Sequence, residues 1–220
     1  ERRFANSYLL SKKIETLTGK KCSFLPAITN ISIRKVSPLS FSKNSFNFLF
    51  VGRLEKVKGP DVLVKACINL LKTVKNFRVN ILGDGRLVNE LKQKVYSSNL
   101  EGKVIFIGWA DENKVASYME ASDALIIPSR SESLPLVLIE AARFRLPVIA
   151  SRVGDCERII KKYKIGYTFN KNDHLELSYA MEKMMNERKI KFSTGLKKID
   201  EEFKQESAVR EFLKQIRLYI

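Results

Sequence analysis

The sequence predicts an α/β protein with a Rossmann-like, doubly wound parallel sheet and helical segments at both ends of the chain. From residue 46 onward, short apolar runs alternate with longer segments of helical periodicity, which is the order of a repeated βα unit. The apolar runs are continuous, as expected for strands that helices cover on both faces. At 220 residues and 45% hydrophobic content, the chain can bury one such core.

The expected elements follow in chain order. Strands are expected at 46–52, 77–83, 103–109, 124–128 and 146–151, with an edge strand at 166–170. Helices are expected at 60–75, 86–98 and 111–121, from Pro135 onward, and at 155–162 and 173–186. Pro60 and Pro135 stand at helix starts, where a missing N–H costs no hydrogen bond. Ligands bind at the carboxyl ends of parallel strands, so the loops after these strands form the expected binding edge.

The two ends of the chain fit this repeat less well. Residues 1–45 contain a helical segment through about Thr18 and then an extended stretch at 21–33. A charged helix is expected from about residue 200 to 220, with an apolar side. That side would carry Phe203, Val209, Phe212, Leu213, Ile216 and Tyr219.

The chain is strongly basic, with a net charge of +16 from 40 Lys and Arg against 24 Asp and Glu. The first 45 residues hold nine of these cations and two Glu. A solvated, Lys-rich surface explains the charge most simply, and an anionic membrane surface would also attract such a cluster. Nucleic acid is the least favoured partner, because the cations do not interleave with aromatic residues and no nucleic-acid-binding motif is present.

Cysteine usage and the lack of long apolar runs indicate a cytoplasmic location, with a peripheral position at the inner face of the membrane left open. Cys22, Cys67 and Cys156 are odd in number, far apart and without metal-ligand spacing, so we expect a reducing compartment and no metal site. No apolar run reaches the roughly 18 residues of a membrane-spanning helix. The stretch ERRFANSYLLSKK at the amino end does not have the pattern of a signal peptide.

The most informative stretch, PSRSESLPLVLIEAARFRLPVIASRVGD, covers residues 128–155. Glu132 lies in a Ser-rich turn after an apolar strand, and Glu140 lies about one and a half turns inside the helix that follows. The start of that helix offers free backbone N–H groups, which favour phosphate. The two carboxylates can accept hydrogen bonds from sugar hydroxyls. A ligand with both phosphate and sugar therefore suits this site.

A second pair, Glu112 and Glu120, has the same spacing and serves as an internal control. With this many Glu residues, roughly one such pair is expected by chance. The segment ENKVASYMEASD around it has the pattern of an ordinary amphipathic helix, so these two carboxylates are expected at the surface. Only Glu132 follows a strand and precedes a helix that begins with Pro.

The loop VGRLEKVKG at 51–59 is the second candidate. Gly52 would let a ligand approach the backbone closely. Arg53 and Lys58 would bring a guanidinium and an ammonium group to the two phosphates of a nucleotide diphosphate. Considered without Glu132, the two residues would be better explained as surface cations in a Lys-rich protein.

Three further positions have two interpretations each. Gly83, in a Gly-Asp-Gly turn, contacts a ligand or simply makes a tight turn, and no third Gly completes a dinucleotide fingerprint. Trp109 is a wall of a base pocket or a packing residue. His174, the single histidine, is expected at the surface or in a helix cap rather than in catalysis.

These motifs, in this order, resemble those of the retaining glycosyltransferases of family four, which have a two-domain GT-B fold. The family pattern is a Glu, seven residues, a second Glu and Ala, and here it reads Glu132-Ser-Leu-Pro-Leu-Val-Leu-Ile-Glu140-Ala141, with Ser133 where Gly is usual. The family's other motif, Gly-Arg-Leu followed by Lys-Gly, matches the 51–59 loop. Val153-Gly154-Asp155 echoes a third, Gly-Gly-x-x-Glu, with Asp155 in place of the second Gly.

The resemblance implies sugar transfer with retention of configuration from a UDP- or GDP-linked donor, without a metal or other cofactor. Arg53 and Lys58 would stabilise the departing diphosphate, and Glu132 would hold hydroxyls of the transferred sugar. Glu140 would hold the ribose hydroxyls. Further donor contacts would come from Gly52, Gly83, Leu134, Pro135, Leu136 and Val137, the last two through their backbone N–H groups.

The resemblance also assigns the parts of the chain to one half of a GT-B fold. Residues 1–45 would be a linker and a remnant of an amino-terminal domain, 46–190 the nucleotide-sugar-binding domain, and 191–220 a helix that packs toward the interdomain side. The amino-terminal domain would be a partner, and the acceptor would be a saccharide or a lipid-linked molecule. We expect this chain alone to bind the donor and to transfer little sugar.

Three alternatives stay open from the sequence. A nucleotide-sugar epimerase shares the fold class, and a non-catalytic nucleotide-sugar-binding module would need the same donor contacts. A basic protein that binds membranes or nucleic acid would have an affinity that falls steeply with salt and would ignore nucleotide sugars.

Overall fold

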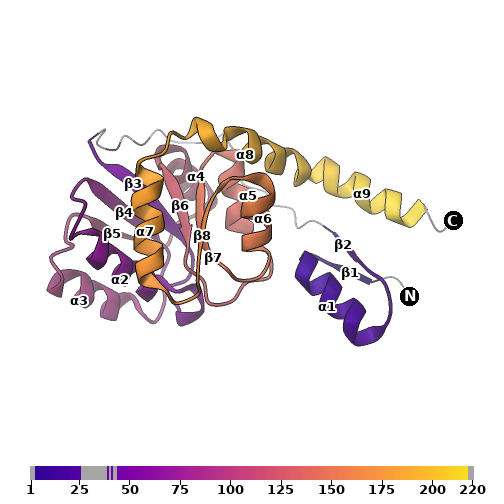
Figure 1. The fold of residues 1–220 in the computed structure, drawn as a ribbon, viewed down its shortest axis with the longest axis horizontal. Helices are drawn as coiled ribbons and strands as arrows, with labels where there is room; N and C mark the ends of the chain where they lie inside the picture. Colours follow the sequence, from indigo (N-terminus) through magenta and orange to yellow (C-terminus); the bar gives the residue numbers. More distant parts are fainter. Residues whose placement is uncertain (1–2, 26–38, 40, 42–43, 218–220) are drawn as a thin grey trace.

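The computed structural model describes residues 3–25, 39, 41 and 44–217, with side chains up to residue 214. Its centre is a six-stranded, wholly parallel sheet in the order β5-β4-β3-β6-β7-β8 (Figure 1). The strands are β3 Phe46–Val51, β4 Phe77–Leu82, β5 Val104–Gly108, β6 Ala124–Ile127, β7 Val148–Ser151 and β8 Gly166–Phe169. The strand at 166–170 was expected at an edge of the sheet, and β8 lies there.

Helices alternate with these strands, which confirms the doubly wound α/β fold. They are α2 Pro60–Leu70, α3 Val88–Ser97, α4 Glu112–Ala121, α5 Leu136–Arg143, α6 Cys156–Tyr163 and α7 His174–Met185, with a short 3-10 turn, η2 Lys56–Lys58, before α2. α2 packs against α3 and α7, whereas α5 and α6 pack against α8 Ile190–Glu202. Right-handed crossovers place α2 and α3 on one face of the sheet and α5 and α6 on the other.

The strand order reverses between β3 and β6. From β3 the chain moves outward through β4 to β5, and it then returns to β6 at the other side of β3 and moves out to β8. Loops that leave β3 and β6 therefore run in opposite directions over the sheet and open a crevice at its carboxyl edge. In open α/β sheets this crevice is where ligands bind. Both candidate loops, 52–59 and 128–135, leave these two strands.

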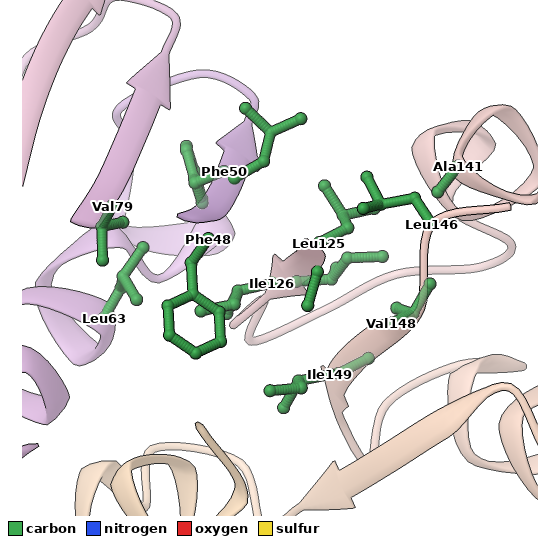
Figure 2. Close-up of a cluster of buried hydrophobic side chains, with 14 of the residues drawn as sticks. Phe48, Phe50, Leu63, Val79, Leu125, Ile126, Ala141, Leu146, Val148 and Ile149 are labelled. Carbon is green, nitrogen blue, oxygen red and sulfur yellow. The ribbon is translucent and has the colours of Figure 1, made fainter. Parts of the chain in front are cut away.

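The three central strands supply the core that supports this crevice. Figure 2 shows side chains of β3, β6 and β7 converging, among them Phe48, Leu125, Ile126 and Ile149. Phe48, Leu125 and Ile149 are fully buried. Burial on both faces explains why the strand sequences are continuous apolar runs. Each large side chain of this kind contributes about 1.5–3 kcal/mol by leaving water, so the loops start from rigid strand ends.

Helix limits differ modestly from the expectations. α2 ends at Leu70 rather than at residue 75, and the chain turns there through successive tight hydrogen bonds. α5 begins at Leu136, one residue later than expected, because Pro135 takes the extended conformation of an N-cap, with ψ of 119°. Asp111 and Asp173 similarly precede α4 and α7 as caps whose side chains accept backbone N–H bonds.

The amino-terminal unit is a small βαβ element beside α9 Gln205–Arg217 (Figure 1). β1 Arg3–Ala5 and β2 Cys22–Phe24 form a two-stranded parallel sheet, and α1 Tyr8–Thr18 connects them. The helix through Thr18 is confirmed, whereas the pairing of two three-residue strands was not predicted. Residues 26–33 of the expected extended stretch lie outside the described residues.

The charged helix expected from about residue 200 to 220 is confirmed as α9, but it begins later than expected. α8 ends at Glu202 and α9 begins at Gln205, with Phe203 between them. Phe203 is 1% exposed and its ring lies 6.2 Å from that of Phe24, so the chain leaves the helical path where this side chain is buried against β2. The side chains of Ile216 and Tyr219 lie outside the described residues. Among the described helices, none is both long and apolar enough to span a membrane.

Candidate functional site

Lys58 and Glu132 meet across the crevice between β3 and β6. Lys58 Nζ lies 2.7 Å from Glu132 Oε1, although the residues are 74 positions apart. Ser129 donates its hydroxyl to the same carboxylate oxygen at 2.7 Å. Among the described residues, both hydrogen bonds of this carboxylate use Oε1, which leaves Oε2 for a ligand hydroxyl. The Lys58 side chain is 30% exposed and that of Glu132 11%, so the pair lies at the crevice wall and is open to a ligand.

Arg130 joins the two loops behind this pair. Its guanidinium nitrogens Nη1 and Nη2 each lie 2.7 Å from an oxygen of Asp61, and its backbone N–H donates to the Val57 carbonyl at 2.7 Å. The guanidinium also donates to the Lys56 carbonyl. Burial alone would raise the pKa of Asp61, but the hydrogen bonds and charge of Arg130 outweigh it and hold that pKa below its usual value. Two bonds in a fork geometry and one backbone bond therefore fix the turn that carries Lys58.

Arg53 lines a separate cavity of about 230 Å³ beside the Lys58–Glu132 pair. The cavity is lined by Val51, Gly52, Arg53, Leu82, Gly83, Asp84, Trp109, Ala110 and Val115. It is smaller than the roughly 300–1,000 Å³ of whole-ligand pockets, so it has room for part of a ligand, such as a base. Arg53 is exposed, and within the described residues its guanidinium has no hydrogen-bond or ion-pair partner.

Gly83 and Trp109 take distinct places in this cavity. A Cβ on Gly83 would come within 2.0 Å of the Gly52 carbonyl oxygen, so the close approach of two loops already requires glycine there. Trp109 is 75% exposed at the rim, which excludes burial in the core as its role. Its indole face is available to a flat ligand group.

The residues at the start of α5 divide into buried and accessible positions. Leu134 and Pro135 are buried, whereas Leu136 is 42% exposed and Val137 is partly exposed. The N–H groups of Leu136 and Val137 have no acceptor in the described part of the chain, since the first turn of a helix has no intrahelical partners. These donors can take an anionic oxygen.

Glu140 lies half-buried in α5, with Glu112 of α4 among its electrostatic neighbours. Burial raises its pKa, the Arg143 guanidinium lowers it, and the Glu112 carboxylate raises it again, so that the pKa is above its usual value. Its electrostatic neighbours are thus Arg143 and Glu112 rather than Lys58 or Arg53. The structure therefore joins Lys58 directly to Glu132, places Arg53 at the separate cavity, and surrounds Glu140 with other charged groups.

Sequence reasoning missed three residues of the site: Ser129, Arg130 and Asp61. The Ser-Arg-Ser run immediately after β6 was a usable signal, because polar residues at a strand's carboxyl end face the binding edge. His174 begins α7, but the capping carboxylate is that of Asp173, which accepts from the N–H groups at 175 and 176. No group of three or more metal-ligating side chains is found among the described residues.

A larger hollow of about 610 Å³ lies along α9, remote from these residues. It is lined by Gln205, Glu206, Val209, Arg210 and Leu213, all from one helix. Among the described residues, polar groups from a second element do not converge on it, as they would at a specific site. The smaller cavity at the sheet edge is therefore the candidate site.

Comparison with known proteins gives the family. The model described as Glycosyl transferases group 1 matches residues 33–205. The UDP-Gal:alpha-D-GlcNAc-diphosphoundecaprenol alpha-1,3-galactosyltransferase of Escherichia coli is 31% identical over 153 residues, which is 68% of this chain and 39% of that protein. A D-inositol 3-phosphate glycosyltransferase of Pseudarthrobacter chlorophenolicus is 30% identical over 155 residues, 69% of this chain and 37% of that protein. The chain thus spans less than half the length of these curated relatives.

Solved structures show the same fold. The Anabaena protein HepE in complex with UDP has a TM-score of 0.83 at 20% identity, over 97% of this chain and 63% of that one. Sucrose-phosphate synthase from Thermosynechococcus elongatus has a TM-score of 0.79 at 20% identity, over 99% and 58%. The α/β architecture matches that of GT-B glycosyltransferases. With the family model covering most of its length, the chain belongs to the group 1 glycosyl transferases.

Proposed function

We propose that this chain binds a UDP- or GDP-linked sugar at the β3–β6 crevice and that the whole protein transfers this sugar with retention of configuration, as in family four. The observation that carries the proposal is the 2.7 Å contact between Lys58 and Glu132. It brings a cation and a carboxylate from two motifs to the point where the strand order reverses, beside the free N–H groups of α5. A ligand with a diphosphate and a sugar needs both kinds of group.

Donor binding would exchange the Lys58–Glu132 contact for contacts to the ligand. Lys58 and Arg53 would move to the diphosphate, with the N–H groups of Leu136 and Val137 on the phosphate nearest the helix. Glu132, released from Lys58, would accept hydroxyls of the transferred sugar. In the transition state the same cations would stabilise the charge that develops on the departing diphosphate. These groups take up the charge without a metal or another cofactor.

The nucleoside would occupy the cavity that Gly52 and Gly83 line, with the base against Trp109. Glu140 would accept the ribose hydroxyls. Leu134 and Pro135 are buried, so they would set the position of the helix start rather than contact the donor.

The acceptor in this proposal is a saccharide or a lipid-linked saccharide, and the name of the Escherichia coli relative gives a lipid-linked acceptor for that enzyme. We place the protein in the cytoplasm, at the inner face of the membrane, in polysaccharide or glycolipid synthesis. The nine cations among the first 45 residues supply attraction to anionic headgroups. Co-sedimentation with anionic but not neutral vesicles would support this placement, and equal binding to both would contradict it.

A thermal-shift panel of nucleotide diphosphates and their sugars, followed by calorimetry, tests the donor assignment. A specific donor at a hundred times its Kd should raise the unfolding free energy by about 2.7 kcal/mol. Arg53→Ala should weaken donor binding roughly ten- to a hundredfold, the value of a charge-assisted hydrogen bond. Arg188→Ala, at an exposed arginine after α7, is the matched control and should leave the affinity unchanged.

If no nucleotide sugar binds, or if Arg53→Ala binds like the wild type, the site is wrong. Catalysis would also need the amino-terminal domain as a partner, so this chain alone should turn over little donor. Robust transfer by the chain alone would contradict that part. An epimerase or a non-catalytic module is not favoured, because the characterised relatives are transferases. Formation of an epimer from donor without acceptor would overturn this choice.

A further inference from the structure

The first turn of α1 is capped by the adjacent Ser7 and by the distant Asp155. Its N-cap residue, Ser7, accepts the Leu10 N–H at 3.2 Å. The carboxylate of Asp155 accepts the Tyr8 N–H at 2.6 Å and the Leu9 N–H at 3.2 Å, across 147 and 146 positions of sequence. The first three N–H groups of the helix are thus satisfied, two of them by a residue of the sheet domain.

The side chain of Asp155 caps α1 rather than α6, the helix that Asp155 precedes. It occupies the N-cap position of α6, where an Asp side chain normally accepts N–H bonds from the helix it precedes, but it makes no such bond. Its side chain is fully buried. The backbone φ of −83° is open to any residue, so this position does not need glycine. A carboxylate can stand here because α1 supplies its partners.

The backbone of Asp155 contacts the turn that carries Glu132. The Asp155 N–H donates to the Ser133 carbonyl at 2.8 Å. Gly154, with φ of +52°, packs so closely that a Cβ would lie 2.3 Å from the Glu132 carbonyl oxygen and 2.4 Å from that of Ser133. A displacement of residues 154–155 would therefore displace the Glu132 turn.

Other contacts hold Tyr8 of α1 against α6 and α8. Its ring stacks on Phe24 with centroids 3.7 Å apart, and the Arg158 guanidinium of α6 lies 3.5 Å from the ring centre. The Tyr8 hydroxyl donates to Glu202 at 3.2 Å. The amino-terminal unit is therefore fixed on the sheet domain next to Asp155.

We propose that Asp155 is a positioning residue that couples the amino-terminal unit to Glu132, the carboxylate assigned to the sugar of the donor. The side chain of Asp155 holds α1, its backbone holds the Ser133 carbonyl, and both depend on one buried conformation. An ordered first turn of α1 then stabilises the turn that carries Glu132. Because coupling between two sites is reciprocal, a bound donor stabilises the first turn of α1 in return. This inference rests on the proposed function only where it concerns the effect of a bound donor.

Hydrogen exchange and calorimetry on Asp155→Ala test the coupling. Without ligand, the variant should exchange the first-turn amides of α1 roughly two- to thirtyfold faster, the loss expected for a helix cap, and residues 129–136 should also exchange faster. Donor affinity should fall roughly three- to thirtyfold, the range for residues that act on a ligand through others. In the wild type, a saturating UDP- or GDP-sugar should slow exchange at the start of α1, and this slowing should vanish in the variant.

Asp173→Ala is the matched control, because Asp173 also accepts two backbone N–H bonds but caps its own helix. It should speed exchange at the start of α7 and leave both residues 129–136 and donor affinity unchanged. Asp155→Asn keeps the size and one acceptor, so it should fall between wild type and Asp155→Ala, and it replaces the alanine variant if that variant does not fold.

Unchanged exchange at 129–136 in both Asp155 variants would overturn the coupling, with or without a donor. A wild-type chain that binds no nucleotide sugar would overturn the proposed function instead, while the ligand-free exchange result would still decide the role of Asp155.

Discussion

Two pairs of glutamates with identical spacing occur in this chain, and the structure gives them different surroundings. Glu112 and Glu120 lie on one helix, α4, and both are exposed. Glu132 lies in the loop after β6 in contact with Lys58, and Glu140 is half-buried in α5. What differs is the strand that precedes each pair.

The strand order explains the difference. β6 lies next to β3 where the order reverses, so the loop after β6 meets the loop that carries Lys58. β5 precedes α4 and lies at the edge of the sheet, so Glu112 begins a helix away from the point where the strand order reverses. The pairs are nevertheless not independent, because the Glu112 carboxylate contributes to the raised pKa of Glu140. Spacing alone therefore does not identify a site, whereas spacing and strand position together do.

Replacement of one glutamate from each pair tests the comparison with the largest expected effect. Glu132→Gln should weaken binding of a nucleotide sugar roughly ten- to a hundredfold, because a charge-assisted hydrogen bond to the sugar is lost. Glu120→Gln, the matched change in the other pair, should leave the Kd within experimental error in calorimetry. Equal losses in the two variants would show that neither pair is specific to the donor.

The Arg130–Asp61 pair tests whether the two loops act as one unit. Arg130→Ala should lower the free energy of unfolding by about 1–3 kcal/mol in urea denaturation. The Asp61 carboxylate would stay partly buried but lose both hydrogen bonds from the Arg130 guanidinium. The substitution should also weaken donor binding, because the turn that carries Lys58 loses its support. Lys161→Ala, which removes an exposed ion pair within α6, should cost no more than about 0.5 kcal/mol.

The same pair predicts a pH dependence of stability. The pKa of Asp61 is lowered in the folded protein, so its contribution is present above the usual value of 3.8 and is lost as the pH falls through the folded pKa. The difference in unfolding free energy between wild type and Arg130→Ala should therefore shrink below that value. A difference that stays constant would show that Asp61 is not the group that Arg130 stabilises.

The pH dependence of donor binding through Glu140 is the smallest expected effect. It tests the electrostatic link between Glu140 and Glu112, one residue from each glutamate pair. Hydroxyls of a donor bind its ionised form, so donor affinity should be full above its raised pKa and fall as the pH drops through it. Calorimetry with a nucleotide sugar at falling pH should show that the affinity begins to decline above pH 4.5, the usual value for a Glu. Glu112→Gln should move this decline to lower pH by removing a like charge, and Glu140→Gln should abolish it.

Much of the sheet domain could be predicted because its signals are local. Continuous apolar runs gave the six strands, and Pro and Gly residues gave most helix starts. Helix ends were less accurate: nothing in residues 60–75 shows that α2 stops at Leu70. The break at Phe203 was missed because neither Gly nor Pro marks it, whereas in the structure its ring is buried 6.2 Å from that of Phe24.

The sequence pointed to some residues of the candidate site but not to their contacts. Resemblance to a family supplied Lys58 and Glu132, yet their pairing depends on the adjacency of β3 and β6, which no local pattern states. Arg130 was missed because its partner Asp61 is 69 positions away. Asp155 stands where a cap for α6 is expected, and its partners lie in α1. Long-range polar contacts of this kind depend on tertiary structure alone.

Hydrogen exchange across the whole chain with a saturating nucleotide sugar tests the central claim most directly, namely that the loops after β3 and β6 form one donor site. The account predicts slower exchange in residues 52–58 and 129–137 together, with no change at 205–213 beside the larger hollow along α9. Protection at 205–213, or protection of only one of the two loops, would contradict it.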